Sequence, residues 1–255
     1  MKKFTYENVM NAKELNIYLE QGNEVLGVLG YTEHSRRHAA KVAVTAGKIL
    51  KKLGYDEHTV ELARIAGYMH DLGNCINRVD HAHTGALMAF QFLRHWGAPP
   101  EDIAVIITAI GQHDEGSGTA VDPVSAALIL ADKTDVRRNR VRNQVRETFD
   151  KHDQVNYAAL SSKLKIDAAK KVVTLEIELD ETICSMMDYF EMLPWPYQGY
   201  AAPGRSGAGG IFMSRLVQAL SGRHIAWIHQ DNSQYILFLN RKRLDFCGDL
   251  VYNDE

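Results

Sequence analysis

Several side chains that can bind metal ions lie at positions that the hydrophobic pattern assigns to the interior of helices. His38 stands four residues before Val42 and continues the apolar face of that helix. Asp132 shares a helix face with apolar residues four and eight positions earlier, and His113 follows Ile110 by three residues. A buried ionised carboxylate is costly unless it is paired or binds a metal. These positions therefore favour a metal site or a buried ion-pair network.

The adjacent residues His70 and Asp71 end another expected helix, just before Gly73. The last turn of a helix can direct both side chains toward one point, although they are neighbours in sequence. A single buried histidine is usually a hydrogen-bonded core residue, and a single buried aspartate is usually a cap or an arginine partner. Together, His38, His70, Asp71 and Asp132 offer nitrogen and oxygen donors from three helices, which suits a divalent transition metal.

The elements that must position these donors are helices over most of residues 36–146. One apolar stripe ends at Gly54, and Asp56 can cap the next helix, which runs to Gly73. A third helix stops at Gly97, Pro99 and Pro100 open a fourth, and Asp122 with Pro123 begins a fifth. The fold class expected is mostly α, a helical bundle.

The pattern changes after residue 160. Residues 164–167 and 172–179 alternate apolar and polar side chains, which predicts a hairpin, followed by a helix over residues 181–193. Glycine, proline and serine dominate 199–210, as in a flexible linker. We expect a helical metal-binding domain over 1–160, the hairpin plus helix packed on it over 161–195, a linker over 196–210, and a small α+β tail over 211–255. That tail should hold a helix over 212–220 and two or three strands near 225–228, 235–239 and 244–251.

Composition restricts the classes of partner. The chain has 255 residues and a formal charge of -3, which gives no overall attraction for nucleic acid. No stretch approaches the roughly 18 apolar residues of a membrane span, so we expect no membrane partner and a cytoplasmic location. Three widely spaced cysteines without a C-x-x-C pair suggest neither a disulfide framework nor a zinc knuckle.

The donor pattern also resembles a known family. The string from His38 to Ala43, the sequence His70-Asp71-Leu72-Gly73 after a 31-residue gap, and Ala131-Asp132 resemble the signature of the HD-domain superfamily. The resemblance covers roughly residues 31–146. It implies an HD-type helical bundle with a small α+β C-terminal part, and metal-dependent phosphohydrolase activity. His34 competes with His38 as the first ligand, and we prefer His38 because Val42 and Ala43 match the apolar pair of the family.

Two further histidines match the subset of HD proteins that hold two metal ions. His81, four residues before Gly85, resembles the family's H-x-x-x-G helix start, and His113 falls in a segment that resembles its His-His-Glu motif. Gln112 departs from that motif, and Asn74 stands where many relatives have lysine. We expect one or two divalent transition ions, Fe, Mn, Co, Ni or Zn, because mixed imidazole and carboxylate donors suit them.

The resemblance also implies roles for residues around the metal. Asp71 could both bind the metal and orient the attacking water, and we assign catalytic roles to Asp71 and Lys133. The basic run from Lys133 to Arg146 can bring two or three cations to the site, and the rest should be solvated. The predicted substrate-binding residues are Arg37, Lys41, Lys133 and Arg137.

The function expected is cleavage of a phosphate ester or phosphodiester in a small, nucleotide-like substrate by a water that the metal activates. Two alternatives stay open. One is a non-catalytic HD module that binds a nucleotide or a protein partner as a sensor, and the other is a di-iron HD oxygenase. A homodimer contact through the C-terminal tail is also left open.

Overall fold

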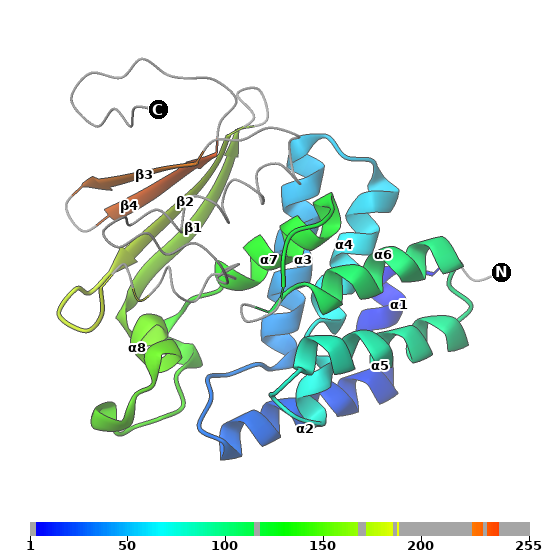
Figure 1. Cartoon of the computed structure of the whole chain (residues 1–255), viewed down its shortest axis with the longest axis horizontal. Helices are drawn as coiled ribbons and strands as arrows, with labels where there is room; N and C mark the ends of the chain where they lie inside the picture. Colours follow the sequence, from blue (N-terminus) through cyan, green and yellow to red (C-terminus); the bar gives the residue numbers. More distant parts are fainter. Residues whose placement is uncertain are drawn as a thin grey trace, which may run out of the picture.

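The structure is a computed structural model that describes residues 4–114, 118–167, 172–185, 188, 226–231 and 234–239. Figure 1 shows helices gathered into one bundle and a small sheet beside it. The α-helices are α1 (Tyr6–Met10), α2 (Lys13–Val28), α3 (Arg36–Leu53), α4 (Glu57–Met69), α5 (His81–His95), α6 (Pro100–Gly111), α7 (Pro123–Lys133) and α8 (Lys151–Ala158). The mostly helical prediction is therefore correct. No helix within the described residues combines the length and apolar character needed to cross a membrane.

Helices α3, α4 and α7 pack against one another at the centre of the bundle. Their ends follow the sequence signals: Gly54 ends α3 in the left-handed conformation, and Asp56 caps α4 by accepting from the Thr59 amide. Asp122 caps α7 in a capping box with Ser125, and Pro123 occupies the first turn. These local signals fix where each central helix begins and ends.

One glycine sets the distance between α3 and α4. A Cβ on Gly67 would lie 2.7 Å from the Cα of Ala43, so the two backbones approach too closely for any side chain at this position. Because Gly67 is one turn before His70, and Ala43 is little more than one turn after His38, this close approach brings the two histidines together. Their ring centroids are 5.3 Å apart.

A short 3₁₀ helix, η1 (Leu72–Cys75), follows α4 and leads to α5. Gly73 lies against the first turn of α5, where any Cβ would overlap the carbonyl oxygen of His81. Helix α6 begins at Pro100 as predicted and packs on α4 and α5. His81 comes shortly after Gly73, and His113 comes shortly after α6. This arrangement places both histidines near the end of α4.

Two parts of the helical prediction need correction. Helices α1 and α2 precede the segment that the sequence pattern assigned to the bundle, and α2 packs on η1. Residues 134–150 do not form a long helix. They follow an extended path that is interrupted by the 3₁₀ turns η2 (Arg138–Arg140) and η3 (Arg146–Thr148). Asp150 then caps the short helix α8. In the extended segment, arginine side chains donate to backbone carbonyls of other segments, which ties the segment to the bundle.

The sheet has strand order β1-β2-β4-β3 and is antiparallel throughout. Strands β1 (Ala159–Asp167) and β2 (Val172–Leu179) form the predicted hairpin, in which Leu164 is opposite Leu175. Strands β3 (Ala226–Asp231) and β4 (Gln234–Leu239) come from the predicted tail and extend the sheet from β2. The sheet joins the bundle where the Ser162 hydroxyl donates to the carbonyl oxygen of Thr134, 2.7 Å away.

The helix predicted over 181–193 does not begin where the sequence placed it. Residues 181–183 form a turn and residues 184–185 have no regular structure, because the Asp180 carboxylate caps this turn through Thr182. The linker over 199–210, the helix over 212–220 and the strand near 244–251 lie outside the described residues. The four-part domain division stays a prediction.

Candidate metal centre

Four donor atoms converge where α3, α4 and α7 meet. Nε2 of His38 lies 3.1 Å from Oδ1 of Asp132 and 3.6 Å from Oδ2 of Asp71. Nε2 of His70 lies 3.1 Å from the same oxygen of Asp71 and 3.7 Å from the same oxygen of Asp132. The structure thus brings together the four residues that the sequence singled out.

Two of these separations, both 3.1 Å, match the coordination shell of one small cation, and the other two are a few tenths of an ångström wider. Ligand atoms about 2.1 Å from an ion, at angles of 90–109°, lie about 3.0–3.4 Å apart. Nε2 of His38 and Oδ2 of Asp71 are buried and make no hydrogen bond to any residue that the structure describes. Such buried polar atoms are costly unless a ligand satisfies them. The residues present therefore fit a divalent metal ion, which these four side chains would hold.

The second nitrogen of each imidazole is already bonded, which fixes the orientation of the ring. Nδ1 of His70 donates to the carbonyl oxygen of Gly67 at 2.8 Å. Nδ1 of His38 donates to Oδ2 of Asp135, also at 2.8 Å. Each bond places the proton on Nδ1 and leaves the Nε2 lone pair for the metal. The rings are thus held in the tautomer that a metal ligand requires.

Asp135 is a buried residue that supports His38, and it is itself surrounded by cations. Arg137 donates to both of its oxygens, at 2.7 and 2.9 Å, and Nζ of Lys41 lies 2.5 Å from Oδ1. Lys41 and Arg137 therefore meet a carboxylate behind His38 and do not line the pocket described below. Arg37 is exposed near the start of α3 and does not line it either. Their assignment to substrate binding stays a prediction without geometric support.

Electrostatics keeps both candidate carboxylate ligands ionised. Burial alone raises the pKa of Asp71, but the neighbouring imidazoles, His70 foremost, outweigh it and hold that pKa well below its usual range. Burial likewise raises the pKa of Asp132, and the charge of Lys133 with the two imidazoles holds it well below normal. Nζ of Lys133 lies 3.0 Å from Oδ2 of Asp132, whereas Oδ1 of the same carboxylate faces His38. Ionised carboxylates are the form that binds a cation.

A second group of donors adjoins the first. Nε2 of His81 lies 4.0 Å from Oδ1 of Asp71 and 3.8 Å from Oδ1 of Asp114. The rings of His81 and His113 are 5.0 Å apart, and each directs its Nδ1 to a carbonyl oxygen three residues earlier. Burial lowers the pKa of His81 to about 4 and that of His113 to about 3, so both are neutral near pH 7. The structure also separates His81, which is buried, from His83, which is exposed.

The residues that depart from the HD pattern have structural roles of their own. Asn74 is buried, and its Nδ2 donates to Oδ1 of Asp71 at 2.7 Å. It therefore orients the carboxylate that joins the two donor groups. Gln112 accepts from the Thr119 amide at 3.0 Å, which ties down the chain after His113 instead of supplying a ligand.

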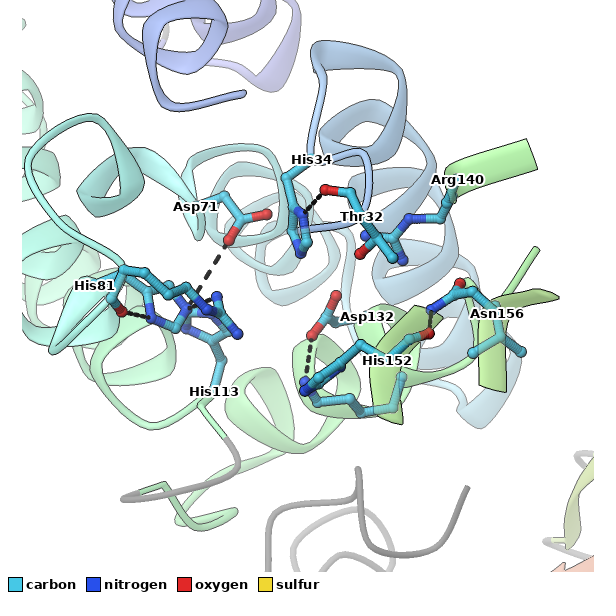
Figure 2. Close-up of a pocket in the computed structure, with 12 residues that line it drawn as sticks. Thr32, His34, Asp71, His81, His113, Asp132, Arg140, His152 and Asn156 are labelled. Carbon is cyan, nitrogen blue, oxygen red and sulfur yellow. Dashed lines mark hydrogen bonds and ion pairs between the residues drawn. The ribbon is translucent and has the colours of Figure 1, made fainter. Parts of the chain in front are cut away.

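A pocket opens above these donors, and Figure 2 shows the residues that line it. His38 and His70 lie beneath the pocket, whereas Asp71, Asp132, His81 and His113 reach its wall. Cations on the wall come from three segments. They are Arg78, Lys133 and Arg140. Of these, the sequence pattern singled out Lys133 for this role.

Five more residues complete the lining, and sequence reasoning did not assign them to substrate binding. They are Thr32, His34, Val136, His152 and Asn156. His34 directs Nδ1 toward the carbonyl oxygen of Thr32 at 2.8 Å, and its ring packs against His38. His38 has the closer approach to the carboxylates, which favours it as the first ligand over His34. Arg140 is buried because it donates to the carbonyl oxygens of Glu33 and Asp135, a role that no sequence signal marks.

Comparison with known proteins identifies the family of the chain. The HD domain family model matches residues 36–193, which is more than half of the chain. The chain belongs to the HD-domain family. The HD match begins at the first residue of α3 and includes both donor groups.

Relatives of this HD protein match over different lengths. An uncharacterized protein of Methanocaldococcus jannaschii is 25% identical over 201 residues, 69% of this chain and 76% of the relative. Ribonuclease Y of Wolinella succinogenes is 32% identical over 127 residues, 49% of this chain and 22% of the relative. Ribonuclease Y of Oceanobacillus iheyensis is 28% identical over 124 residues, again 22% of the relative.

One crystal structure is also similar. It is a predicted HD superfamily hydrolase from an uncultured Thermotogales bacterium, with 23% identity and a TM-score of 0.39. The match covers 49% of this chain and 68% of that one.

Proposed function

We propose that the chain is a metal-dependent phosphohydrolase that cleaves a phosphate ester or phosphodiester of a small, nucleotide-like substrate. The observation that carries this proposal is the convergence of four donor atoms, with 3.1–3.7 Å between each imidazole nitrogen and each carboxylate oxygen, beneath a pocket whose wall carries three cationic side chains. Metal ligands and cations facing one pocket suit an anionic substrate that a divalent ion activates.

The metal would be held by His38, His70, Asp71 and Asp132. A divalent ion bound there lowers the pKa of a water molecule and screens negative charge on phosphoryl oxygens. Asp71 has a further role in this proposal, because it lies between both donor groups and is ionised, so it can accept a hydrogen bond from the attacking water and orient it. Asn74 keeps that carboxylate in place.

The cations on the pocket wall would bind the substrate phosphate. Lys133 neutralises Asp132 from the side and brings a positive charge to the edge of the donor group, where the phosphoryl group must approach. Arg140 is held rigidly by two backbone carbonyls, so little side-chain entropy is lost when it meets an anion. The pocket lining also includes His34, His152 and Asn156, which offer rings and an amide to the rest of a nucleotide-like substrate.

A longer RNA is the second candidate substrate, because the HD segment is similar to part of Ribonuclease Y. The small substrate is favoured by the charge distribution. The chain has a net charge of -3, and the cations that face the site are confined to one pocket wall. Binding of a long nucleic acid depends on several phosphate contacts along a basic surface.

The test combines metal analysis with turnover on the full chain. Protein freed of metal with a chelator and reloaded with Mn²⁺, Zn²⁺ or anaerobic Fe²⁺ should retain metal near stoichiometry and release nitrophenol from nitrophenyl phosphate or bis-nitrophenyl phosphate. His70→Ala and Asp132→Asn should lose both properties while circular dichroism stays unchanged. His83→Ala removes an exposed histidine two residues from His81 and serves as the matched control.

Three results would replace the proposal with another function. Metal retention without turnover of either ester would favour the sensor, and oxygen uptake by the Fe²⁺ form would favour the oxygenase. Faster cleavage of a 20-nucleotide RNA than of either small ester would favour the ribonuclease. Full activity in His70→Ala or Asp132→Asn would refute the site itself.

A further inference from the structure

The second donor group differs from the first because a side chain of the protein already contacts one of its donor atoms. His81 and His113 face Asp71 from α5 and from the end of α6, a place where a second ion could bind. The measured separations there, 3.8 and 4.0 Å from Nε2 of His81 to the carboxylates, are wider than in the first group. The Nε2 lone pair of His81 that a second ion would need is also engaged by the protein itself.

Arg78 engages both nitrogens of the His81 ring. Its carbonyl oxygen accepts from Nδ1 at 3.0 Å, and Nη1 of its guanidinium lies 3.0 Å from Nε2. Because Nδ1 carries the proton, Nη1 donates to the Nε2 lone pair. A nitrogen whose single lone pair accepts this hydrogen bond cannot bind a metal ion at the same time. Oδ1 of Asp71 accepts from Asn74 at 2.7 Å, which uses one of the two lone pairs of that oxygen.

The guanidinium also supplies the charge that a second ion would bring. It belongs to the pocket wall together with His81 and His113, and it carries a positive charge. A planar guanidinium binds phosphoryl oxygens through paired N–H donors, in a fixed geometry. Arg78 thus combines a permanent cation with anion recognition beside the donors of the first group.

We propose that Arg78 takes the place of a second metal ion, so that the site holds one divalent cation and the guanidinium binds the phosphoryl group from the side of His81. The inference rests on the proposed function, since it assigns a role toward the same substrate. His81 then positions Arg78 and does not bind metal. This role departs from the two-metal arrangement that the histidine pattern in the sequence implies.

Metal stoichiometry tests the first half of the inference without any turnover. Calorimetric titration with Mn²⁺, checked by mass spectrometry of the dialysed protein, should give one ion per wild-type chain. Arg78→Ala frees the His81 lone pair and should raise the stoichiometry toward two. Arg78→Ala combined with His81→Ala should return it to one, and Arg94→Ala, which removes an exposed arginine of α5, should stay at one.

Phosphate affinity tests the second half with a matched pair of variants. In the Mn²⁺-loaded proteins, His81→Ala keeps the guanidinium, whereas the double variant lacks it, and neither can hold a second ion on His81. Inorganic phosphate, measured by calorimetry, should bind the double variant about tenfold or more weakly, the size expected for loss of a charge-assisted contact.

The outcomes separate this inference from the proposed function. Two ions in the wild type, one ion in Arg78→Ala, or equal phosphate affinity in the matched pair would each overturn the role of Arg78 and leave the phosphohydrolase proposal intact. Absence of any bound ion in the wild type would overturn the proposed function, and this inference with it.

Discussion

The Asp135 carboxylate accepts a 2.8 Å hydrogen bond from Nδ1 of His38, whose other ring nitrogen faces Asp132 at 3.1 Å. A carboxylate behind a metal-binding imidazole fixes the ring and raises its basicity. Asp135→Asn should therefore lower metal affinity by about 10–100-fold while the first donor group stays complete. Titration with Mn²⁺ measures this loss. Glu20→Gln, which removes an exposed ion pair with Arg36 near the start of the same helix, is the control. Unchanged affinity in Asp135→Asn would show that Asp135 acts on folding alone.

Arg142 is not the solvated charge that the sequence pattern predicted. Nη1 donates to the carbonyl oxygen of Asn23 at 2.9 Å, and Nη2 donates to the side-chain oxygen of Asn23, which also accepts from the His34 amide. Arg142→Ala should cost about 1–2 kcal/mol of stability, because the carbonyl of α2 loses a charged donor. That corresponds to a fall of about 3–6 °C in the unfolding midpoint. Arg146→Ala, which removes an exposed side chain that packs on Tyr157, should change the midpoint by less.

Asp153 gives a pH-dependent prediction. Its side chain is buried, and Oδ1 has no hydrogen-bond partner within the described part of the chain. Burial, followed by the charge of Asp150, raises its pKa. A carboxyl whose pKa is higher in the folded state binds its proton more tightly there. Stability is therefore lost as pH rises from the unfolded value of about 3.9 through the folded pKa.

The Asp153→Asn variant removes this loss. At pH 7.5 it should raise the thermal unfolding midpoint of the metal-free protein by about 2–4 °C for each kcal/mol of unfolding free energy recovered. At pH 4.5 the increase should be smaller. Calorimetric unfolding at both values measures the difference. An equal effect at the two pH values would mean that the amide acts through packing, and a lower midpoint at pH 7.5 would contradict the sign.

Metal binding should stabilise the fold, because the donors converge in the folded chain alone. At a free metal concentration 100 times the dissociation constant, the gain is about 2.7 kcal/mol. The unfolding midpoint should then rise by about 5–10 °C over the chelated protein. His70→Ala should abolish the rise and His83→Ala should keep it. A shift of equal size in His70→Ala would place the stabilising metal elsewhere.

The sequence by itself determined the helical bundle and the first donor group. The limits of the helices depend on local signals in the sequence, so they can be found without tertiary contacts. These signals are the cap at Asp56, Pro100, Pro123 and Gly54. His38 and Asp132 could be found because a polar residue on an apolar stripe breaks a periodic pattern. The pair His70 and Asp71 could be found because helix ends direct neighbouring side chains together. The family motif selected His81 by its spacing from Gly85, but helical periodicity did not show that His81 is buried and His83 is exposed.

Tertiary structure alone decided which charges reach the site. Arg78, Arg140 and Lys133 line the pocket, whereas Lys41 and Arg137 bind Asp135 behind His38, and nothing in their spacing distinguishes the two groups. The path of residues 134–150 decides this outcome, because its arginines bond to carbonyls more than 100 positions earlier in the chain. Such contacts depend on how distant segments pack, so a local sequence pattern cannot predict them.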